Sequence, residues 1–290
     1  MDIKRLITPV CFLGVICLIL IFFSCKKDIY DSKPTLNILM LHMVTDKMPD
    51  DPTLNTLYIT DKSLREYCEY FNDKYTIVSL NEAYDIIKNN KEVDNPNLLA
   101  FTFDDGYDNN YFLAYPILKE LGIKANINII ARYSDEERDG YLTWKEIKEM
   151  SDSGLIEIGN HTYDSHYYTT SIDGTSRPIL STTLPGEDSK KREERILGDL
   201  RLADNMISNA INKKINVLAY PYGVPPFDLM DKIEDEFGYD IQLLVRTGVN
   251  KNINEFYKLN RFTVNGTQSP SELEEVMKKY NGLEFIKTIK

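Results

Sequence analysis

Apolar and polar positions alternate in a regular order along the chain from Leu36 onward. Short apolar runs, which are typical of buried strands, are followed by stretches with apolar residues three and four positions apart, which are typical of amphipathic helices. The predicted strands are Asn37–Leu41, Thr76–Ser79, Leu98–Phe103, Ala125–Ile130, Leu155–Gly159, Asn216–Ala219, Ile241–Val245 and Lys258–Phe262. The predicted helices are Thr60–Asn72, Asn81–Asn89, Asn110–Leu121, Trp144–Ser153, Asp188–Ile211, Pro226–Glu236 and Pro270–Tyr280.

This alternation predicts an α/β fold, with parallel strands covered by helices. With so many units in succession, we expect a closed or nearly closed sheet, a distorted (β/α) barrel of about seven parallel strands, rather than an open sheet. A single domain would span residues 36–290. Two helix starts are well marked, because Thr143–Glu146 and Ser269–Glu272 have the pattern of a capping box.

The stretch Tyr167–Glu187 is rich in Ser, Thr, Gly and Pro and lies between a predicted strand and a predicted helix. In (β/α) barrels the functional groups lie at the carboxyl ends of the strands, and this stretch would be a long loop at that end. We expect it to form a rim or a lid.

The N-terminus is typical of an export signal, because Lys4 and Arg5 precede an apolar run from Leu6 to Phe23. Phe22-Phe23-Ser24-Cys25 resembles a bacterial lipoprotein cleavage site, in which a small residue precedes a cysteine that becomes lipidated. We therefore expect a lipoprotein signal peptide at 1–24, lipidation of Cys25 and a tether at 25–35. The alternative is an uncleaved membrane anchor, since about 18 apolar residues can span a bilayer. Both place the rest of the chain outside the cytoplasm, attached to a membrane of the bacterial cell envelope.

Cysteine usage agrees with this division. Cys11 and Cys17 lie in the predicted signal and Cys25 would carry lipid, so only Cys68 remains and no internal disulfide framework is expected. Cys68 lies on the apolar face of the predicted helix Thr60–Asn72, which favours a small buried side chain over a nucleophile.

The charge balance excludes some partners. A net charge of −11 without a dense Lys/Arg cluster argues against nucleic-acid binding. It also argues mildly against a polyanionic substrate, because like charges repel at long range. The composition identifies no protein partner.

Two adjacent carboxylates end one predicted strand, because Leu98–Phe103 runs directly into Asp104-Asp105-Gly106. Adjacent carboxylates repel each other and are costly to hold together unless a cation or a proton is nearby. A solvated Asp-Gly turn is the alternative.

Two of the three histidines, His161 and His166, follow the predicted strand Leu155–Gly159. Their spacing of five aligns them neither on a helix nor on one face of a strand, so only a curled loop would bring them together. Curled loops often build metal sites, whereas two unrelated surface histidines are the alternative. Combined with Asp104 and Asp105, the histidines suggest a two-His-one-carboxylate site, for zinc in hydrolysis or for iron in oxygen chemistry.

The order of several short motifs resembles the polysaccharide deacetylase family, the carbohydrate esterases of the nodulation N-deacetylase type. Residues 101–106 (Phe-Thr-Phe-Asp-Asp-Gly) look like its first signature, the segment from His161 to His166 like its second, and Ala219–Gly223 like its third. The histidine spacing, the stretch Leu39–His42 and the segment Lys258–Val264 are similar to the branch that acts on biofilm poly-N-acetylglucosamine.

The resemblance implies roles for these residues. Asp105, His161 and His166 would hold a divalent metal, usually Zn²⁺, which polarises the acetyl carbonyl and lowers the pKa of its water from about 16 toward about 7. Asp104 would be the general base that takes a proton from that water. The backbone N–H of Tyr222 would help to stabilise the oxyanion.

The general acid is less directly marked. Many family members supply a histidine from a late Leu-x-His motif, but no histidine follows His166 in this chain. The similar branch implies His42, at the end of the first predicted strand, with a structural histidine as the alternative. Arg261 would orient Asp104 through a charge-assisted bond or would make a structural ion pair.

These roles together imply an extracytoplasmic, metal-dependent hydrolase that removes N-acetyl groups from a polysaccharide, which could resemble poly-N-acetylglucosamine, chitin or peptidoglycan. An O-acetyl esterase acting on a glycan such as xylan would use the same site. A non-catalytic glycan-binding protein with a degenerate deacetylase fold is a further alternative. An iron oxygenase fits the ligand triad but not the neighbouring Asp104.

Overall fold

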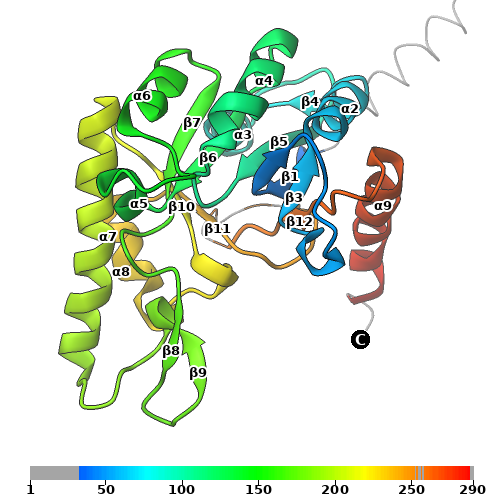
Figure 1. Cartoon of the computed structure of the whole chain (residues 1–290). Coiled ribbons are helices and arrows are strands. Elements are labelled where there is room, and N and C mark those ends of the chain that lie inside the picture. Colours follow the sequence, from blue (N-terminus) through cyan, green and yellow to red (C-terminus); the bar gives the residue numbers. More distant parts are fainter. Residues whose placement is uncertain (1–32, 252, 254–255, 257, 288–290) are drawn as a thin grey trace, which may run out of the picture.

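The computed structural model describes residues 33–251, 253, 256 and 258–287 (Figure 1). The expected signal peptide at 1–24, the lipidated Cys25 and all but the last residues of the tether at 25–35 lie outside the described residues. No helix in the described part of the chain combines the length and the apolar character that crossing a membrane requires.

One parallel sheet forms the centre of the molecule, in the order β11-β10-β7-β6-β5-β1-β12, with β4 beside β5 outside this path. Its strands are β1 (Thr35–Leu41), β4 (Thr76–Ile77), β5 (Asn97–Phe103), β6 (Ala125–Ile129), β7 (Ile156–Asn160), β10 (Val217–Ala219), β11 (Ile241–Leu243) and β12 (Phe262–Thr263). The sheet curls into a distorted (β/α) barrel, which confirms the predicted fold class.

Irregular backbone links the two ends of this sheet. The N–H of Leu244 donates to the carbonyl of Leu259 (2.9 Å), and the N–H of Arg261 donates to the carbonyl of Arg246 (3.0 Å). The predicted strand Lys258–Phe262 was therefore wrong in its bounds. Residues 258–261 form the seam, a segment that hydrogen-bonds to the chain after β11. Only Phe262–Thr263 pairs with β1.

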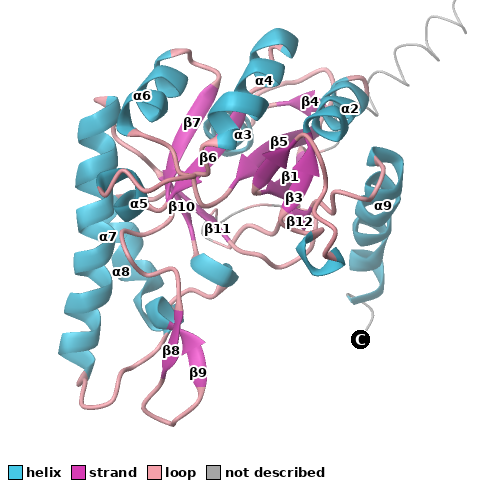
Figure 2. Cartoon of the chain, viewed as in Figure 1, coloured by secondary structure: helices cyan, strands magenta, loops and turns pink. Residues whose placement is uncertain are grey.

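Helices surround the strands (Figure 2). They are α2 (Asp61–Asn72), α3 (Leu80–Lys88), α4 (Tyr115–Leu121), α6 (Trp144–Asp152), α7 (Ser189–Ile211), α8 (Met230–Phe237) and α9 (Pro270–Lys287). The predicted capping boxes at Thr143–Glu146 and Ser269–Glu272 are confirmed by reciprocal hydrogen bonds. The predicted helix Asn110–Leu121 begins as a π-helical turn, since Pro116 has no N–H to donate to the preceding turn.

The two faces of the sheet differ in what covers them. On one face, side chains such as Leu39 and Phe101 pack against the surrounding helices, and Cys68 of α2 is buried among them, as predicted. On the other face, Ile38 and Ala100 form a second apolar cluster with residues of α3. This second face becomes polar toward the carboxyl ends of the strands, which places polar side chains at one end of the barrel.

The stretch Tyr167–Glu187 is more ordered than a loop. It contains a hairpin of β8 (Tyr168–Thr170) and β9 (Ser176–Pro178), which projects from the body of the molecule (Figure 1). Arg195 of α7 anchors the chain that follows β9, because the guanidinium donates to the carbonyls of Ile179 (3.0 Å) and Thr182 (2.8 Å). Three further short elements were not predicted: β2 (Met43–Thr45), β3 (Tyr58–Thr60) and α5 (Ala131–Asp135).

Candidate active site

The residues singled out in the sequence meet at the carboxyl ends of the strands. His42 follows β1, Asp104 follows β5 and His161 follows β7. The ladder of the sheet continues into them, since the N–H of Asp104 donates to the carbonyl of Leu41 (2.9 Å) and the N–H of His161 to that of Ile129 (2.9 Å). The backbone of the sheet thus fixes where their side chains begin.

Asp105, His161 and His166 form one cluster. Oδ1 of Asp105 lies 3.3 Å from Nε2 of His161 and 3.3 Å from Nε2 of His166. One donor atom from each residue lies within 4.8 Å of the other two. The histidine pair that the sequence placed five residues apart therefore converges on the second carboxylate of the Asp-Asp motif.

A curled loop produces this convergence, as expected. Thr162 has a left-handed backbone (φ 77°), and its N–H donates to the side chain of Asn160 (2.6 Å). The carboxylate of Asp199 on α7 then accepts the N–H groups of Tyr163 (3.0 Å) and Asp164 (2.9 Å). These bonds satisfy backbone donors that a tight loop would otherwise leave unpaired.

The donor set fits a divalent metal ion. Nδ1 of His161 lies 2.7 Å from the carbonyl of Ala219, an acceptor, so Nδ1 carries the proton and Nε2 presents its lone pair to the cluster. Burial, followed by the nearby His161, lowers the pKa of His166 to about 4, so this ring is neutral at pH 7. Oδ1 of Asp105 is buried and has no hydrogen-bond partner among the described residues. A buried carboxylate oxygen facing two imidazole lone pairs requires a cation or a proton between them.

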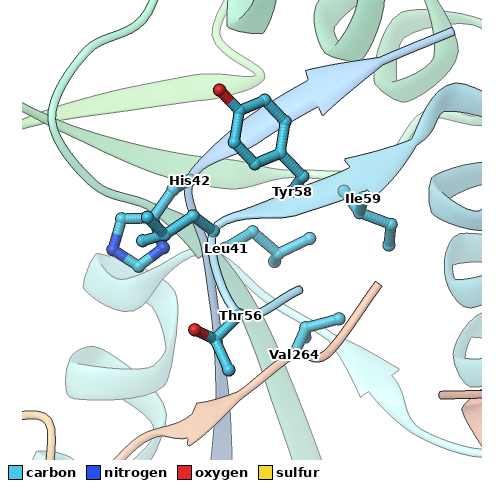
Figure 3. A pocket seen from close by; sticks show the side chains of 7 residues that line it. Leu41, His42, Thr56, Tyr58, Ile59 and Val264 are labelled. Carbon is cyan, nitrogen blue, oxygen red and sulfur yellow. The ribbon is translucent and has the colours of Figure 1, made fainter. Parts of the chain in front are cut away.

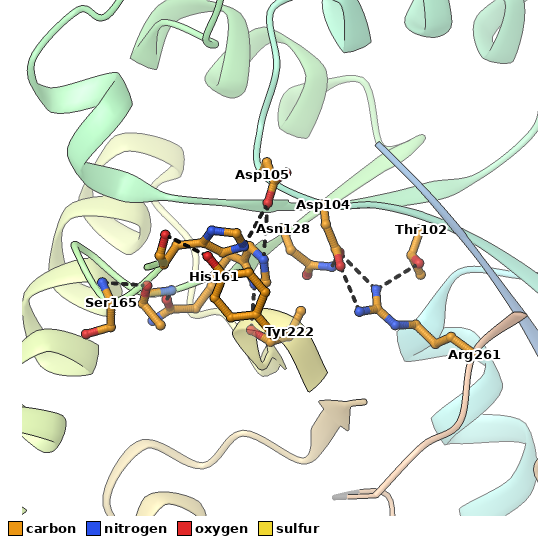
Figure 4. Close-up of polar contacts among 12 residues, drawn as sticks. Thr102, Asp104, Asp105, Asn128, His161, Ser165, Tyr222 and Arg261 are labelled. Atoms are coloured by element: carbon orange, nitrogen blue, oxygen red, sulfur yellow. Dashed lines mark hydrogen bonds and ion pairs between the residues drawn. The ribbon is translucent and has the colours of Figure 1, made fainter. Parts of the chain in front are cut away.

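Asp104 is held by two partners. Its carboxylate accepts two parallel bonds from Arg261 (2.9 and 2.7 Å) and one from Nδ2 of Asn128 (2.8 Å), as Figure 4 shows. Burial alone would raise the pKa of Asp104, but the charge of Arg261 and the hydrogen bonds that its guanidinium donates outweigh it and hold that pKa well below its usual range. Asp104 is therefore ionised and fixed in orientation.

Arg261 is fully buried and bonds to three residues. Besides Asp104, it donates from Nε to the carbonyl of Leu244 (2.8 Å) and from Nη1 to the hydroxyl of Thr102 (3.3 Å). These contacts tie the seam after β11 to the end of β5. The geometry thus contains both arrangements considered for Arg261, the orientation of Asp104 and an ion pair that supports the fold.

His42 lies beside these carboxylates. The charges of Asp104 and Asp105 act on its ring, but burial has the larger effect and lowers its pKa below the ordinary 6.5. Its Nδ1 is buried without a hydrogen-bond partner in the part of the chain that the structure describes. The ring forms one edge of a small pocket that Leu41, Ile59 and Val264 also line (Figure 3).

Tyr222 follows β10 in the turn Pro221–Gly223 and has a left-handed backbone (φ 58°). Its hydroxyl donates to the carbonyl of His166 (3.2 Å), and its ring lies 4.6 Å from that of His166. Asp105 (φ 75°) has the same kind of backbone as Tyr222 and Thr162. The candidate site therefore holds three non-glycine residues in a conformation that non-glycine residues rarely adopt.

Asn128 also contacts Asp104, and this contact was not predicted from the sequence. The signal was present, because β6 carries Asn126 and Asn128 in an otherwise apolar, fully buried strand, where asparagine is unfavourable. Gly159 on β7 is paired with Asn128, and a Cβ on Gly159 would lie 2.1 Å from Oδ1 of Asn128. The glycine is therefore required by the packing of this side chain.

Comparison with known proteins agrees with the motifs. Residues 91–241, just over half of the chain, match the family model described as polysaccharide deacetylase. YxkH of Bacillus subtilis (strain 168) is 26% identical over 237 residues, which is 81% of this chain and 74% of that protein. The poly-beta-1,6-N-acetyl-D-glucosamine N-deacetylase of Staphylococcus aureus (strain MRSA252) is 29% identical over 186 residues, 62% of this chain and 57% of that protein.

Solved structures show the same fold. IcaB from Ammonifex degensii superimposes with a TM-score of 0.67 at 26% identity, covering 84% of this chain and 96% of that one. A de-N-acetylase from Aggregatibacter actinomycetemcomitans superimposes with a TM-score of 0.73 at 21% identity, covering 84% of this chain and 100% of that one. With the family model matched over the centre of the barrel and the motif residues gathered at one end of it, the chain belongs to the polysaccharide deacetylase family.

Proposed function

We propose that this protein is a metal-dependent N-deacetylase that hydrolyses the acetamido groups of an extracellular or envelope polysaccharide built from N-acetylglucosamine. One observation carries the proposal: a cluster of the buried Asp105 and His161 and the half-buried His166 lies beside the ionised, oriented Asp104. The Staphylococcus aureus relative, which is named for poly-beta-1,6-N-acetyl-D-glucosamine, supports this class of substrate over acetylxylan.

Asp105, His161 and His166 would hold the metal, which we expect to be Zn²⁺. When bound, the ion supplies Lewis-acid polarisation of the acetyl carbonyl and a more acidic water. Hydrolysis breaks the bond between the acetyl carbon and the sugar nitrogen, and it yields acetate and an amine. The protein must therefore accept one proton from water and donate one to the leaving nitrogen.

Asp104 is suited to accept the proton. Oδ1 already accepts two hydrogen bonds, whereas among the described residues Oδ2 accepts one, from Arg261. A carboxylate oxygen can accept two bonds, so Oδ2 keeps a lone pair for water. Arg261 and Asn128 act through Asp104 by fixing its plane, and they are positioning residues.

His42 is the candidate donor to the leaving nitrogen, and the backbone N–H of Tyr222 is the candidate donor to the oxyanion. Both follow strand ends beside the cluster. A buried imidazole in reach of two carboxylates can carry a proton into the site. Its unpaired Nδ1 is consistent with a group whose partner is the substrate.

The test measures acetate release by purified residues 26–290, before and after treatment with a chelator. Substrates are β-1,6-linked N-acetylglucosamine oligomers, chitin oligomers, peptidoglycan and acetylxylan. We expect release from the N-acetylglucosamine polymers, its loss with the chelator and its return with Zn²⁺. Asp105→Ala and His161→Ala should abolish both bound metal and acetate release, whereas Asp139→Ala, at an exposed acidic residue, should change neither.

The other outcomes separate the rival functions. Unchanged acetate release in Asp105→Ala would refute the proposal. Release from acetylxylan alone would assign an O-acetyl esterase, and tight glycan binding without acetate release would assign a binding protein. Iron rather than zinc in the purified protein would favour oxygen chemistry.

We also propose that the enzyme is lipid-anchored through Cys25 in the bacterial cell envelope. The leader at 1–24 supports this location, and the location agrees with a glycan substrate outside the cytoplasm.

A further inference from the structure

Two exposed aromatic rings lie next to the candidate metal cluster and have no place in the reaction described above. Tyr168, on β8 of the hairpin, is 53% exposed, and Tyr222 is 36% exposed. Their ring centroids are 4.6 Å apart, with the planes inclined at 60°. The two rings therefore form an open corner rather than a pair buried in the core.

This corner is continuous with the candidate active site. The ring of Tyr222 lies 4.6 Å from the ring of His166 at an angle of 38°, and its hydroxyl donates to the His166 carbonyl. A ligand in contact with the ring of Tyr222 is therefore close to His166, a candidate metal ligand.

The corner is also held in place before any ligand arrives. Tyr222 is fixed by its turn and by its hydrogen bond to His166. The hairpin that carries Tyr168 is closed by the bond from the N–H of Ile179 to the carbonyl of Tyr167 (3.0 Å), and Arg195 anchors it to α7. Preorganised aromatic surfaces bind with little loss of conformational entropy.

The shape and chemistry of the corner match a sugar ring. A pyranose has apolar faces of C–H groups and a polar rim of hydroxyls, and a tyrosine has an apolar face and a polar tip. Ligand sites combine such apolar surfaces with a few polar groups that fix orientation. The charged residues of the hairpin, Asp173 and Arg177, neutralise each other in an ion pair, which agrees with a neutral ligand at the corner.

We propose that the corner of Tyr168 and Tyr222 binds the pyranose ring that neighbours the sugar being deacetylated. The inference rests on the proposed function and extends it, because it makes the enzyme selective for polymer over isolated acetylated groups. Tyr168 is then a specificity-determining residue that a loop outside the barrel supplies.

The test compares kcat/KM for a β-1,6-linked N-acetylglucosamine tetramer with kcat/KM for 4-methylumbelliferyl acetate, an ester without a sugar. In Tyr168→Ala the ratio of the two should fall about three- to tenfold, the range expected for the loss of one aromatic contact, with most of the change in KM for the tetramer. Tyr168→Phe, which keeps the ring, should recover most of the ratio.

Ile172→Ala is the matched control, since it truncates a side chain on the same hairpin that is 62% exposed. Its ratio should equal that of the wild type. An unchanged ratio in Tyr168→Ala, or an equal fall in Ile172→Ala, would overturn the inference while leaving the deacetylase intact.

A calorimetric titration with the tetramer separates the two proposals. If the wild type releases no acetate from the tetramer, the proposed function fails and binding alone tests the corner. Weaker binding by Tyr168→Ala than by the wild type and Ile172→Ala would support the inference, and equal binding by all three would refute it.

Discussion

Arg261 and Asp104 form an ion pair that is almost completely removed from solvent. Taking two charges out of water is costly, and the cost is offset only where each charge is fully hydrogen-bonded. Here the guanidinium has acceptors on Asp104, Thr102 and Leu244, and the carboxylate has donors on Arg261 and Asn128. Stability and chemistry therefore depend on the same two side chains.

Arg261→Met should destabilise the protein by about 3–5 kcal/mol, because it leaves a buried carboxylate without its counter-charge. The free energy of unfolding in urea measures this loss. Adding Asp104→Asn should restore part of the stability, since the amide carries no charge. Arg177→Met, which removes an exposed pair with Asp173, should cost less than about 1 kcal/mol. Equal losses for Arg261→Met and Arg177→Met would contradict this account.

His42 has a pH signature if it is the acid. The acid must carry its proton, and the protonated fraction falls as pH rises above the pKa, which burial places below 6.5. kcat/KM for the tetramer should therefore decline with rising pH through that lowered pKa. His42→Ala should lower kcat about 100-fold, keep the metal content of the wild type and lose this decline. A variant with the pH profile of the wild type would make His42 a structural residue.

The candidate functional residues were predictable from the sequence where they lie close together in short motifs. Asp104, Asp105, His161 and His166 lie in two short motifs directly after predicted strands, and the structure brings them together. Asn128 lies in a third strand, and its contact with Asp104 depends on how β5 and β6 align. Tyr168 contacts Tyr222 only because the hairpin lies against the turn Pro221–Gly223, which no periodicity encodes.

At the scale of elements, the register of β6 and β7 connects packing to the site. Asn128 and Gly159 are opposite each other; Oδ1 of Asn128 occupies the space that a Cβ at 159 would need, while its Nδ2 donates to Asp104 on the other side. The missing side chain on one strand thus permits a polar contact from its neighbour.

Gly159→Ala should destabilise the protein by about 1–3 kcal/mol, because the new Cβ overlaps Oδ1 of Asn128 in a packed interior. Displacement of Asn128 should also lower kcat for acetate release. Gly198→Ala in α7 is the control: its Cβ would meet nothing within 4 Å, so about 0.5–1 kcal/mol of added helix stability is expected. Thermal unfolding and acetate release measured on both variants check this, and a neutral Gly159→Ala would refute the packing argument.

Elements with strong periodicity were predictable and those made by long-range contacts were not. The parallel strands and main helices appear close to their expected positions, since each buries an apolar face of its own. The seam before β12 is set by bonds to the chain after β11, and the hairpin is set by its anchor on α7. From composition alone, the seam therefore resembled a strand and the hairpin resembled a loop.

At the scale of the whole molecule, attachment to the membrane is predicted to depend on one residue. If Cys25 carries the lipid, the wild type should incorporate a labelled fatty acid and lack residues 1–24, whereas Cys25→Ser should incorporate none, because the thiol that carries the lipid has been removed. Acetate release from the soluble tetramer should not change. A wild type that takes up no fatty acid and retains residues 1–24 would instead indicate an uncleaved anchor at residues 6–23.

The left-handed backbone at Asp105, Thr162 and Tyr222 has a consequence for laboratory evolution. Each such non-glycine residue costs of order 1–3 kcal/mol relative to a relaxed conformation. A screen for heat tolerance alone would therefore enrich glycine at positions 105, 162 and 222, and in doing so it would remove a candidate ligand and the aromatic corner. Thermotolerant variants of this enzyme should be selected by acetate release after heating. At these three positions, stability of the fold favours glycine, whereas the candidate site requires the side chains that are present.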